Sequence, residues 1–297
     1  MKILSLQKFF FINLLTLVIP YIPRRVSSCI AGLLGFFSFI ILRGRRRAII
    51  EVLGVVKPEV SHFTTMKLAC KNLINYANNF ADFLRLYNMD AKELTNMTEV
   101  NGLEHFSAAL RNNKGTILLS AHLGNWEVGS NFMAAYGFPV VGVAESAGPG
   151  EMFYKLFKRY REHFGITILS LEDPSVGFRL RRFLKKGYIV GLIGDRDIAG
   201  TGVEVEFFGK RAIFPQGPAF LSLVTKSPII PGFFLRNRGR GKKLYSIYAE
   251  EPIDFKGGKE LRGDIKNLTQ VIAKRIEEMI RRYPDQWFSF PPPWKRK

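Results

Sequence analysis

The chain of 297 residues is long enough for one large domain, or for a domain with an appended membrane segment. Apolar residues make up 47% and charged residues 23%, which excludes both a disordered chain and a polytopic membrane protein. The 44 basic and 25 acidic residues give a formal net charge of +19, so an anionic partner is expected: nucleic acid, anionic lipid, or an acidic protein or cofactor. Two cysteines, Cys29 and Cys70, exclude a cysteine-rich zinc module and a disulfide framework.

The first 50 residues carry eight basic and no acidic side chains around two apolar runs, 9–23 and 26–42. The second run has 17 uncharged residues, which is the lower limit for crossing a bilayer. Arginines lie between the runs and again at 43–47, so no charge asymmetry orients a spanning helix. We therefore expect a helical pair inserted in one leaflet, with its arginines on anionic head groups; a single span is the alternative.

Residues 26–29 (VSSC) superficially match a lipoprotein cleavage box. Arg24 and Arg25 interrupt the apolar region just before this box, whereas a cleavable signal needs its apolar core to lead directly to the cut site. Cleavage is therefore not expected. The sequence predicts a membrane-associated helical anchor with an arginine cluster over residues 1–47 and one further domain over residues 48–297.

From residue 51 the pattern becomes that of an α/β domain. A long helix is expected over 61–86, with Ser61 as its N-cap. Strands are then expected at 115–121, 139–143, 166–169, 188–194, 228–235 and 243–249, and helices at 126–136, 151–164, 174–186, 217–226 and 260–282. Alternating strands and helices predict a mainly parallel sheet covered by helices on both faces.

Of the four histidines, only His122 has a carboxylate five positions later, at Glu127. His122 directly follows the strand expected at 115–121, at the carboxyl end where open α/β sheets place their ligands. On one continuous helix the two side chains would lie roughly 140° apart, but a turn at Gly124-Asn125 lets them meet. A histidine backed by a carboxylate suits a general base that takes a proton from a hydroxyl. The alternative is a strand-end histidine beside an exposed glutamate.

Other catalytic signatures are missing from the sequence. There is no Gly-x-Ser-x-Gly elbow, which argues against an α/β-type serine hydrolase. There is also no Walker A loop and no Gly-x-Gly-x-x-Gly fingerprint. Without an internal nucleophile, His122 is expected to activate an acceptor hydroxyl directly.

The residues around His122 also resemble a known family. Residues 120–127 (SAHLGNWE) look like the His-x4-Asp/Glu box of the lipid A late acyltransferases (lauroyl/myristoyl type) and the related phosphatidylinositol mannoside acyltransferases. The resemblance continues through 194–197 (GDRD), 202–209 (GVEVEFFG) and 215–219 (PQGPA), and with the apolar N-terminus it covers nearly the whole chain. It implies a glycerolipid-acyltransferase-like α/β fold, with residues 48–297 as the catalytic domain.

The implied reaction moves a fatty acyl group from a thioester to a hydroxyl of a membrane glycolipid such as a lipid A precursor. No metal and no bound cofactor are expected, because acyl-acyl carrier protein or acyl-coenzyme A enters as the donor substrate. The implied partners are anionic membrane lipid, the glycolipid acceptor and, for one of the two donors, acyl carrier protein. The implied location is the cytoplasmic face of the inner membrane.

By resemblance, His122 looks like the base, and Glu127 like the group that orients it and offsets its positive charge. Asp195, after the strand expected at 188–194, resembles the family's second acidic catalytic residue; the alternative is a surface carboxylate paired with a neighbouring arginine. Arg159 or Arg161 resembles the arginine that follows the box, unless both are merely solvated. The remaining substrate-binding or turn-shaping candidates are Asn125, Trp126 and Arg196.

Several alternatives stay open at the level of sequence. Glycerol-phosphate acyltransferases carry a Phe-Pro-Glu-Gly-Thr-Arg-type segment, whereas residues 214–218 read FPQGP here and lack its Glu and Arg. Segment 202–209 looks closer to the mannoside branch, so a phosphatidylinositol mannoside, another glycolipid or a lysophospholipid is the alternative acceptor. A non-enzymatic basic protein that binds membranes or nucleic acid is the alternative of another class. Because no nucleic-acid module is recognisable, nucleic acid is not expected as a partner.

Overall fold

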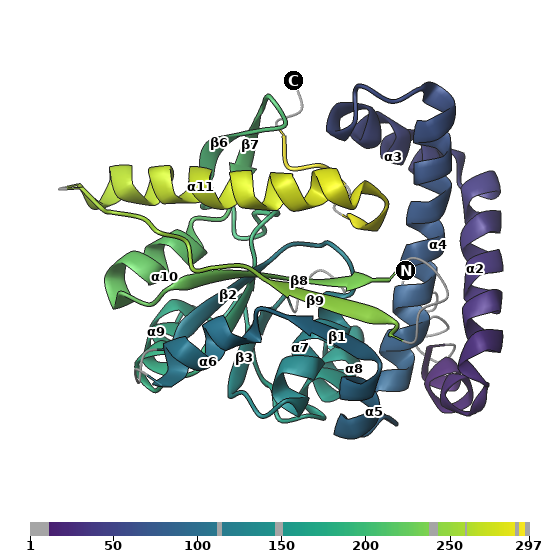
Figure 1. The fold of residues 1–297 in the computed structure, drawn as a ribbon, viewed down its shortest axis with the longest axis horizontal. Helices are drawn as coiled ribbons and strands as arrows, with labels where there is room; N and C mark the ends of the chain where they lie inside the picture. Colours follow the sequence, from purple (N-terminus) through teal and green to yellow (C-terminus); the bar gives the residue numbers. More distant parts are fainter. Residues whose placement is uncertain are drawn as a thin grey trace.

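The computed structural model describes residues 12–111, 115–145, 151–237, 243–258, 260–288 and 291–294. These residues form an α/β fold around a seven-stranded sheet of order β1-β9-β8-β2-β5-β3-β4 (Figure 1). Its strands are β1 (Thr98–Asn101), β2 (Thr116–Ser120), β3 (Val140–Ala144), β4 (Thr167–Ser170), β5 (Ile189–Ile193), β8 (Ile229–Arg236) and β9 (Tyr245–Ala249). All neighbours pair in parallel except β8 and β9, so the predicted mainly parallel sheet is confirmed.

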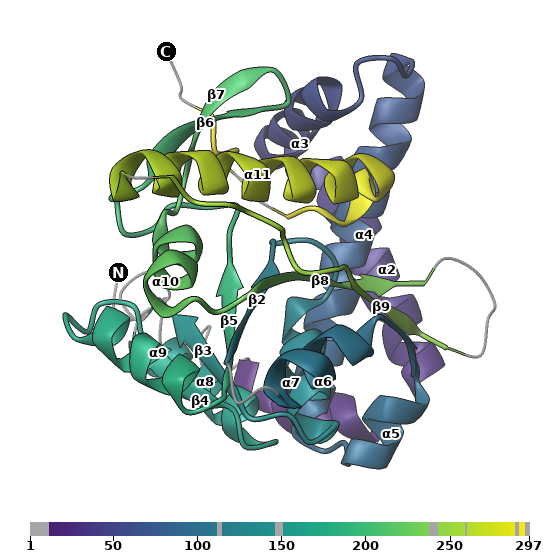
Figure 2. The same cartoon turned by 60° about the vertical axis from the view of Figure 1, so that its left-hand side comes forward.

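Helices cover both faces of this sheet (Figure 2). One face packs against α9, α10 and α11, and the other against α6, α7 and α8, as expected for parallel strands joined by helical crossovers. The helices are α2 (Arg24–Ile41), α3 (Arg43–Val56), α4 (His62–Leu86), α5 (Ala91–Asn96), α6 (Leu103–Arg111), α7 (Trp126–Ala135), α8 (Glu151–Glu162), α9 (Val176–Lys185), α10 (Gly217–Thr225), α11 (Leu261–Arg282), and the 3-10 turns η1 (Ile19–Tyr21) and η2 (Pro284–Gln286).

The expected elements agree with the structure to within a few residues. Ser61 caps α4 as predicted, because its hydroxyl accepts a hydrogen bond from the Thr64 amide at 3.3 Å. The sequence patterns did not predict α3, α5, β1 and α6, nor the antiparallel hairpin of β6 (Val203–Phe207) and β7 (Lys210–Phe214). The hairpin lies outside the main sheet and packs against α11, where the Glu206 amide donates to Gln270. The hairpin was not predicted because its strands are short and pair with each other, not with strands of the main sheet.

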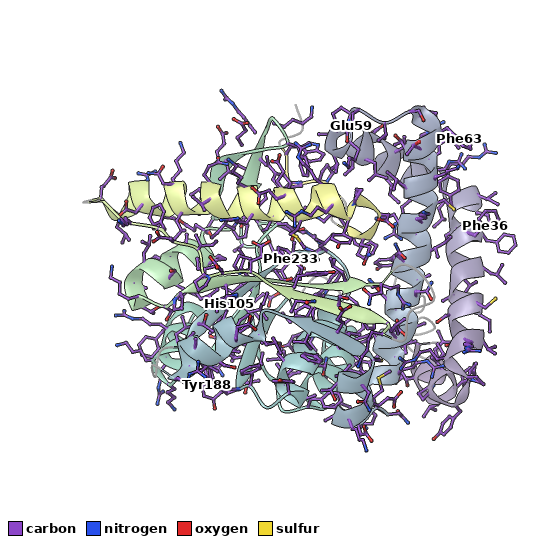
Figure 3. All side chains as sticks on the ribbon, viewed as in Figure 1. Phe36, Glu59, Phe63, His105, Tyr188 and Phe233 are labelled. Atoms are coloured by element: carbon purple, nitrogen blue, oxygen red, sulfur yellow. The ribbon has the colours of Figure 1, made fainter. Side chains whose placement is uncertain are left out.

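Helix α4 stands between α2 and the sheet (Figure 1). The contact of α2 with α4 is so close at Gly35 that a Cβ atom there would lie 2.6 Å from the Ile74 Cα, so only glycine fits. The other side of α2 exposes large apolar residues, including Leu34 and Ile41, and Phe36 projects away from the molecule (Figure 3). In the described part of the chain, α2 is the helix that is long and apolar enough to cross a membrane by length and composition.

The expected boundary at residues 47/48 falls inside α3. Ile49 and Leu53 of α3 pack against α4, and Val56 joins the core beneath the sheet. Helix α2 is tied to the same body, because the Arg85 guanidinium of α4 donates to the Ser27 hydroxyl at 2.8 Å. In the structure, residues 24–56 therefore pack onto the α/β fold through α4.

Candidate active site

His122 and Asp195 meet where β2 and β5, which are adjacent parallel strands, both end. The imidazole Nδ1 lies 2.8 Å from Asp195 Oδ1, and the His122 backbone amide donates to both carboxylate oxygens at 3.1 and 3.2 Å. The Trp287 indole Nε1–H donates to Oδ2 at 2.8 Å. Asp195 is wholly buried, while 21% of the His122 side chain is exposed. The dyad is thus closed on its carboxylate side and open on its imidazole side.

The hydrogen bonds around Asp195 fix its charge. Burial alone would raise the pKa of Asp195, but the neighbouring His122 and the hydrogen bonds from His122 and Trp287 hold that pKa below its ordinary value. An ionised carboxylate only accepts hydrogen bonds, so the proton between the two groups sits on His122 Nδ1. With Nδ1 facing Asp195, Nε2 is the ring nitrogen that is left to take a proton from a substrate.

Within the described part of the chain, Glu127 makes no hydrogen bond or ion pair with His122, which differs from the pairing expected from the sequence. Its carboxylate instead accepts from Arg161 of α8, with Nε at 2.8 Å from Oε2 and Nη2 at 2.5 Å from Oε1. The Trp126 indole N–H also donates to Glu127 at 3.2 Å. Burial would lower the pKa of Arg161, but the charge of Glu127 raises it above its ordinary value, so the pair is ionic. The carboxylate that orients the imidazole is Asp195.

The turn between His122 and α7 is built as the sequence predicts, and Gly124 makes it possible. Gly124 has φ +69°, and a Cβ there would lie 2.0 Å from the Phe234 carbonyl oxygen, so a larger residue is excluded. Asn125 caps α7 by accepting from the Val128 amide at 3.2 Å, and its Nδ2 donates to the buried Tyr245 hydroxyl. Asn125 was expected to bind substrate or shape the turn; its buried, fully occupied side chain shapes the turn.

A row of polar residues on α4 holds this loop and the C-terminal segment together. Asn79 Nδ2 donates to the Gly124 carbonyl at 2.7 Å, and Asn72 Nδ2 donates to the Trp287 carbonyl at 2.8 Å. Two further members of the row, Asn75 and Asp82, bond to the Asp285 carbonyl and to the Arg236–Tyr245 pair. The spacing 72, 75, 79 and 82 marks one helical face, and this signal was overlooked at the level of sequence.

The C-terminal segment after α11 completes the site, which no sequence pattern predicted. Besides the Trp287 bond to Asp195, the Phe288 amide donates to the His122 carbonyl at 2.7 Å. The Gly124 amide donates to the Gln286 carbonyl at 2.8 Å. A strand-end loop and a segment about 165 residues later therefore share one hydrogen-bond network, because the closing helix α11 returns the chain to the sheet edge.

The other expected site residues lie at different positions relative to the His122–Asp195 dyad. The Trp126 ring packs edge-on against the His122 ring, with 5.1 Å between centroids. Arg159 lies on the exposed side of α8, where it donates to the Tyr87 hydroxyl at 2.7 Å and does not reach the dyad. Arg196, directly after Asp195, is exposed, and within the described residues it makes no hydrogen bond or ion pair. Among the candidate substrate residues, Trp126 therefore packs against His122, and Arg161 is linked to Trp126 through Glu127.

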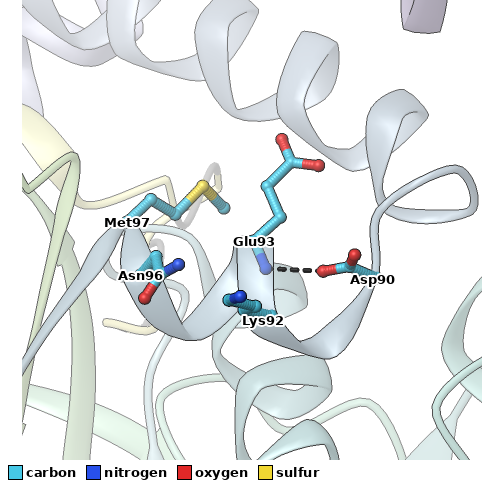
Figure 4. A pocket seen from close by; sticks show the side chains of 5 residues that line it. All are labelled: Asp90, Lys92, Glu93, Asn96 and Met97. Carbon is cyan, nitrogen blue, oxygen red and sulfur yellow. Dashed lines mark hydrogen bonds between the residues drawn. The ribbon is translucent and has the colours of Figure 1, made fainter.

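Two surface hollows lie away from His122. One, of about 430 Å³, is formed by Asp90, Lys92, Glu93, Asn96 and Met97 (Figure 4), and Glu93 there pairs with Arg24 of α2 at 3.3 Å. The other, of about 670 Å³, opens at the amino-end side of β8 between α10 and α11. Neither holds a histidine, so neither competes with the dyad as a catalytic centre. Across the residues that the structure describes, no group of three or more His, Cys, Asp or Glu side chains is arranged to hold a metal ion.

The fold and the site together are typical of a class of enzyme: an α/β protein with a histidine–carboxylate dyad at the carboxyl ends of parallel strands, a geometry that suits a general base. The sequence profile of the family described as "Bacterial lipid A biosynthesis acyltransferase" matches residues 1–296. The chain therefore belongs to this acyltransferase family, as the resemblance of its motifs predicted, and it is an enzyme that transfers acyl groups.

Relatives of known name are similar over most of the chain. The phosphatidylinositol mannoside acyltransferase of Mycobacterium tuberculosis (strain CDC 1551 / Oshkosh) is 31% identical over 255 residues, which cover 84% of this chain and 76% of the relative. The phosphatidylinositol mannoside acyltransferase of Mycolicibacterium smegmatis is 30% identical over 227 residues, covering 75% of this chain and 71% of the relative.

Proposed function

We propose that the protein transfers a fatty acyl group from an acyl thioester to a sugar hydroxyl of a phosphate-bearing membrane glycolipid. The observation that carries this proposal is the His122–Asp195 dyad, whose buried carboxylate holds Nδ1 at 2.8 Å and leaves Nε2 for the acceptor. The names of the relatives favour a phosphatidylinositol mannoside as the acceptor, and the family description makes a lipid A precursor the second acceptor to test.

The reaction follows from the protonation states of the dyad. Nε2 of His122 takes the proton of the acceptor hydroxyl as its oxygen attacks the thioester carbonyl, and Asp195 stabilises the imidazolium that forms. The tetrahedral intermediate collapses, the C–S bond breaks, and the imidazolium returns its proton to the leaving thiolate. The products are an ester and a free thiol. No covalent enzyme intermediate is needed, and fixing both substrates contributes through orientation.

The proposed location is the membrane surface, with the dyad on the side where acyl thioesters are made, the cytoplasm. Support comes from the exposed apolar side of α2 and from the basic side chains around it, which suit insertion beside anionic head groups. The donor is proposed to be acyl-acyl carrier protein or acyl-coenzyme A, both of which present a thioester carbonyl to the dyad.

The test is a lipid product analysis with the purified full-length protein. Palmitoyl-coenzyme A or palmitoyl-acyl carrier protein is incubated with a phosphatidylinositol mannoside or a lipid A precursor in mixed micelles. We expect mass spectrometry to find an acceptor heavier by one acyl group, and free thiol released in equal amount. The His122→Ala variant is the control and should give neither product. Thiol release without any acylated lipid would show a thioesterase and would disprove the proposal.

A further inference from the structure

A continuous row of aromatic rings runs from His122 to the arginine cluster at the start of α3. The Trp126 ring contacts His122, Phe288 lies 6.2 Å from Trp126, and Tyr76 lies 5.6 Å from Phe288, each measured between centroids. The row ends at Arg45, whose guanidinium lies 5.2 Å above the Tyr76 ring. The row thus brings together three separate parts of the chain: α3 with α4, the start of α7 and the C-terminal segment.

These rings are not buried as core residues are. Trp126 and Phe288 are partly buried, Tyr76 is 42% exposed, and Arg45 is exposed. Within the described residues, the Arg45 guanidinium makes no hydrogen bond or ion pair, so its donors are available to an anion. Partly exposed aromatic rings beside the exposed Arg45 guanidinium present apolar faces and a charged donor to the same ligand.

We propose that this row, Arg45–Tyr76–Phe288–Trp126, is the head-group subsite for an anionic glycolipid acceptor. The sugar rings pack their C–H faces on the aromatic rings, and the phosphate pairs with Arg45. This inference rests on the proposed function and names the part of the protein that receives its acceptor. Neighbouring ring centroids in the row lie 5.6 and 6.2 Å apart, which is comparable with the length of one hexose unit, so successive sugars match successive rings.

The direction of the row favours the acceptor over the donor. Arg45 lies in the first turn of α3, directly after α2, whose exposed apolar side faces away from the α/β fold (Figures 1 and 3). A glycolipid keeps its acyl chains in the leaflet, its phosphate at the interface and its sugars farther out. The row presents the matching order: apolar helix, Arg45, aromatic rings, His122. A glycolipid held in this way brings a sugar hydroxyl to Nε2 without leaving the bilayer.

The test compares two acceptors that differ in phosphate. Full-length protein acylates either a phosphatidylinositol dimannoside or a diglucosyl diacylglycerol in mixed micelles, with palmitoyl-coenzyme A as donor. The variant Arg45→Gln is compared with Arg47→Gln, which removes the same charge from the same cluster but lies about 200° around α3. We expect Arg45→Gln to raise the acceptor KM about tenfold for the phosphate-bearing lipid only, because one charge-assisted contact is lost. Neither kcat nor the donor KM should change, and Arg47→Gln should leave all three constants near wild type.

The rings are tested by a second pair of variants. Tyr76→Leu keeps an apolar side chain but removes the aromatic face, and Tyr76→Phe keeps the face. We expect Tyr76→Leu to raise the acceptor KM severalfold for both lipids, and Tyr76→Phe to leave it unchanged. Melting temperatures of all variants should equal that of the wild type, because Tyr76 and Arg45 are exposed.

Each contrary result has a distinct meaning. Equal effects of Arg45→Gln and Arg47→Gln would reduce Arg45 to general surface charge and overturn the subsite. A raised donor KM with an unchanged acceptor KM would assign the row to the thioester and its phosphate instead, which also overturns it. If the wild type acylates neither of these lipids nor the lipid A precursor, the proposed function fails and the subsite fails with it. If it acylates an acceptor and the variants match it, only the subsite fails.

Discussion

Two carboxylates lie beside the loop that carries His122, and their surroundings differ sharply. Asp195 is wholly buried, accepts from the His122 backbone and ring and from Trp287, and belongs to a loop that follows the central strand β5. Glu127 retains 16% exposure in the first turn of α7 and pairs with Arg161 of the neighbouring helix α8. The first environment fixes the proton on an imidazole, and the second locks two helices together. Substitutions in the first should therefore affect chemistry, and those in the second should affect substrate placement.

The largest effect is expected at the base of the dyad. His122→Ala removes the nitrogen that we propose takes the acceptor proton, so turnover should fall on the order of 100- to 10,000-fold. Because the imidazole is partly exposed, the melting temperature should stay close to that of the wild type. Steady-state turnover and thermal unfolding of the same preparation test this; turnover near wild type would remove His122 from the mechanism.

Asp195→Asn should come next, with a loss of turnover on the order of 100-fold. The amide has one accepting oxygen for the three donors that now converge on the carboxylate, so the ring loses its fixed tautomer. A matched control is Asp173→Asn, a carboxylate in the loop between β4 and α9 that bonds only locally. An activity of Asp195→Asn equal to that of this control would show that Asp195 does not support the base.

Asp195→Asn should also change how the free energy of unfolding depends on pH. The pKa of Asp195 is lowered in the folded protein, so its ionised form stabilises the fold above its unfolded pKa of about 3.9, and this contribution is lost as the pH falls through the folded pKa. Below about pH 5, the free energy of unfolding of the wild type should therefore fall more steeply with decreasing pH than that of Asp195→Asn. Parallel curves for the two proteins would contradict the lowered pKa.

A smaller effect is expected at the C-terminal segment. Trp287→Phe keeps a large aromatic ring but removes the N–H that donates to Asp195, and one such hydrogen bond is worth about 1 kcal/mol, so turnover should fall about fivefold. Trp294→Phe is the control, because that ring packs near Trp287 without a bond to the dyad. Equal activities of the two variants would mean that the indole N–H does not position Asp195.

Breaking the Glu127–Arg161 ion pair should change KM more than kcat. Glu127→Gln and Arg161→Gln each remove one half of the same ion pair. Each should raise the KM of the thioester or of the glycolipid acceptor several-fold, while kcat stays within about threefold of wild type. The double variant should be little worse than either single one, since the partners act as a unit. Additive losses, or a fall in kcat as large as that of Asp195→Asn, would give Glu127 a direct role at the imidazole.

The smallest effect on turnover in detergent is expected from the exposed side of α2. Replacing Leu34, Phe37 and Ile41 by serine removes apolar side chains that are each more than half exposed, so activity on dispersed acceptor should be unchanged. Binding to anionic liposomes should instead become sensitive to salt, because only the arginines remain to hold the protein there. A flotation assay across a salt series decides this. A wild-type protein that leaves the liposomes at high salt would show that α2 is not inserted.

Local sequence patterns determine much of the fold. The alternation of apolar runs and amphipathic segments predicted β2, β5 and the helices between them, and Ser61 and Gly124-Asn125 predicted a helix start and a tight turn. These features depend on neighbours within a few positions, where backbone sterics and hydrogen bonding act directly. The position of His122 at a strand end is of the same kind, and it gave the first indication of a catalytic base.

The partners of that base were decided only by the tertiary structure. Asp195 reaches His122 because β5 lies beside β2, although two strands and three helices separate them along the chain. Glu127 has the expected spacing from His122, yet it pairs with Arg161 because α8 packs against α7. Trp287 arrives from the far end of the chain. Sheet order and helix packing follow from burial summed over the whole core, so no short window of sequence contains them, whereas the strand, the turn and the histidine itself are determined within about ten residues.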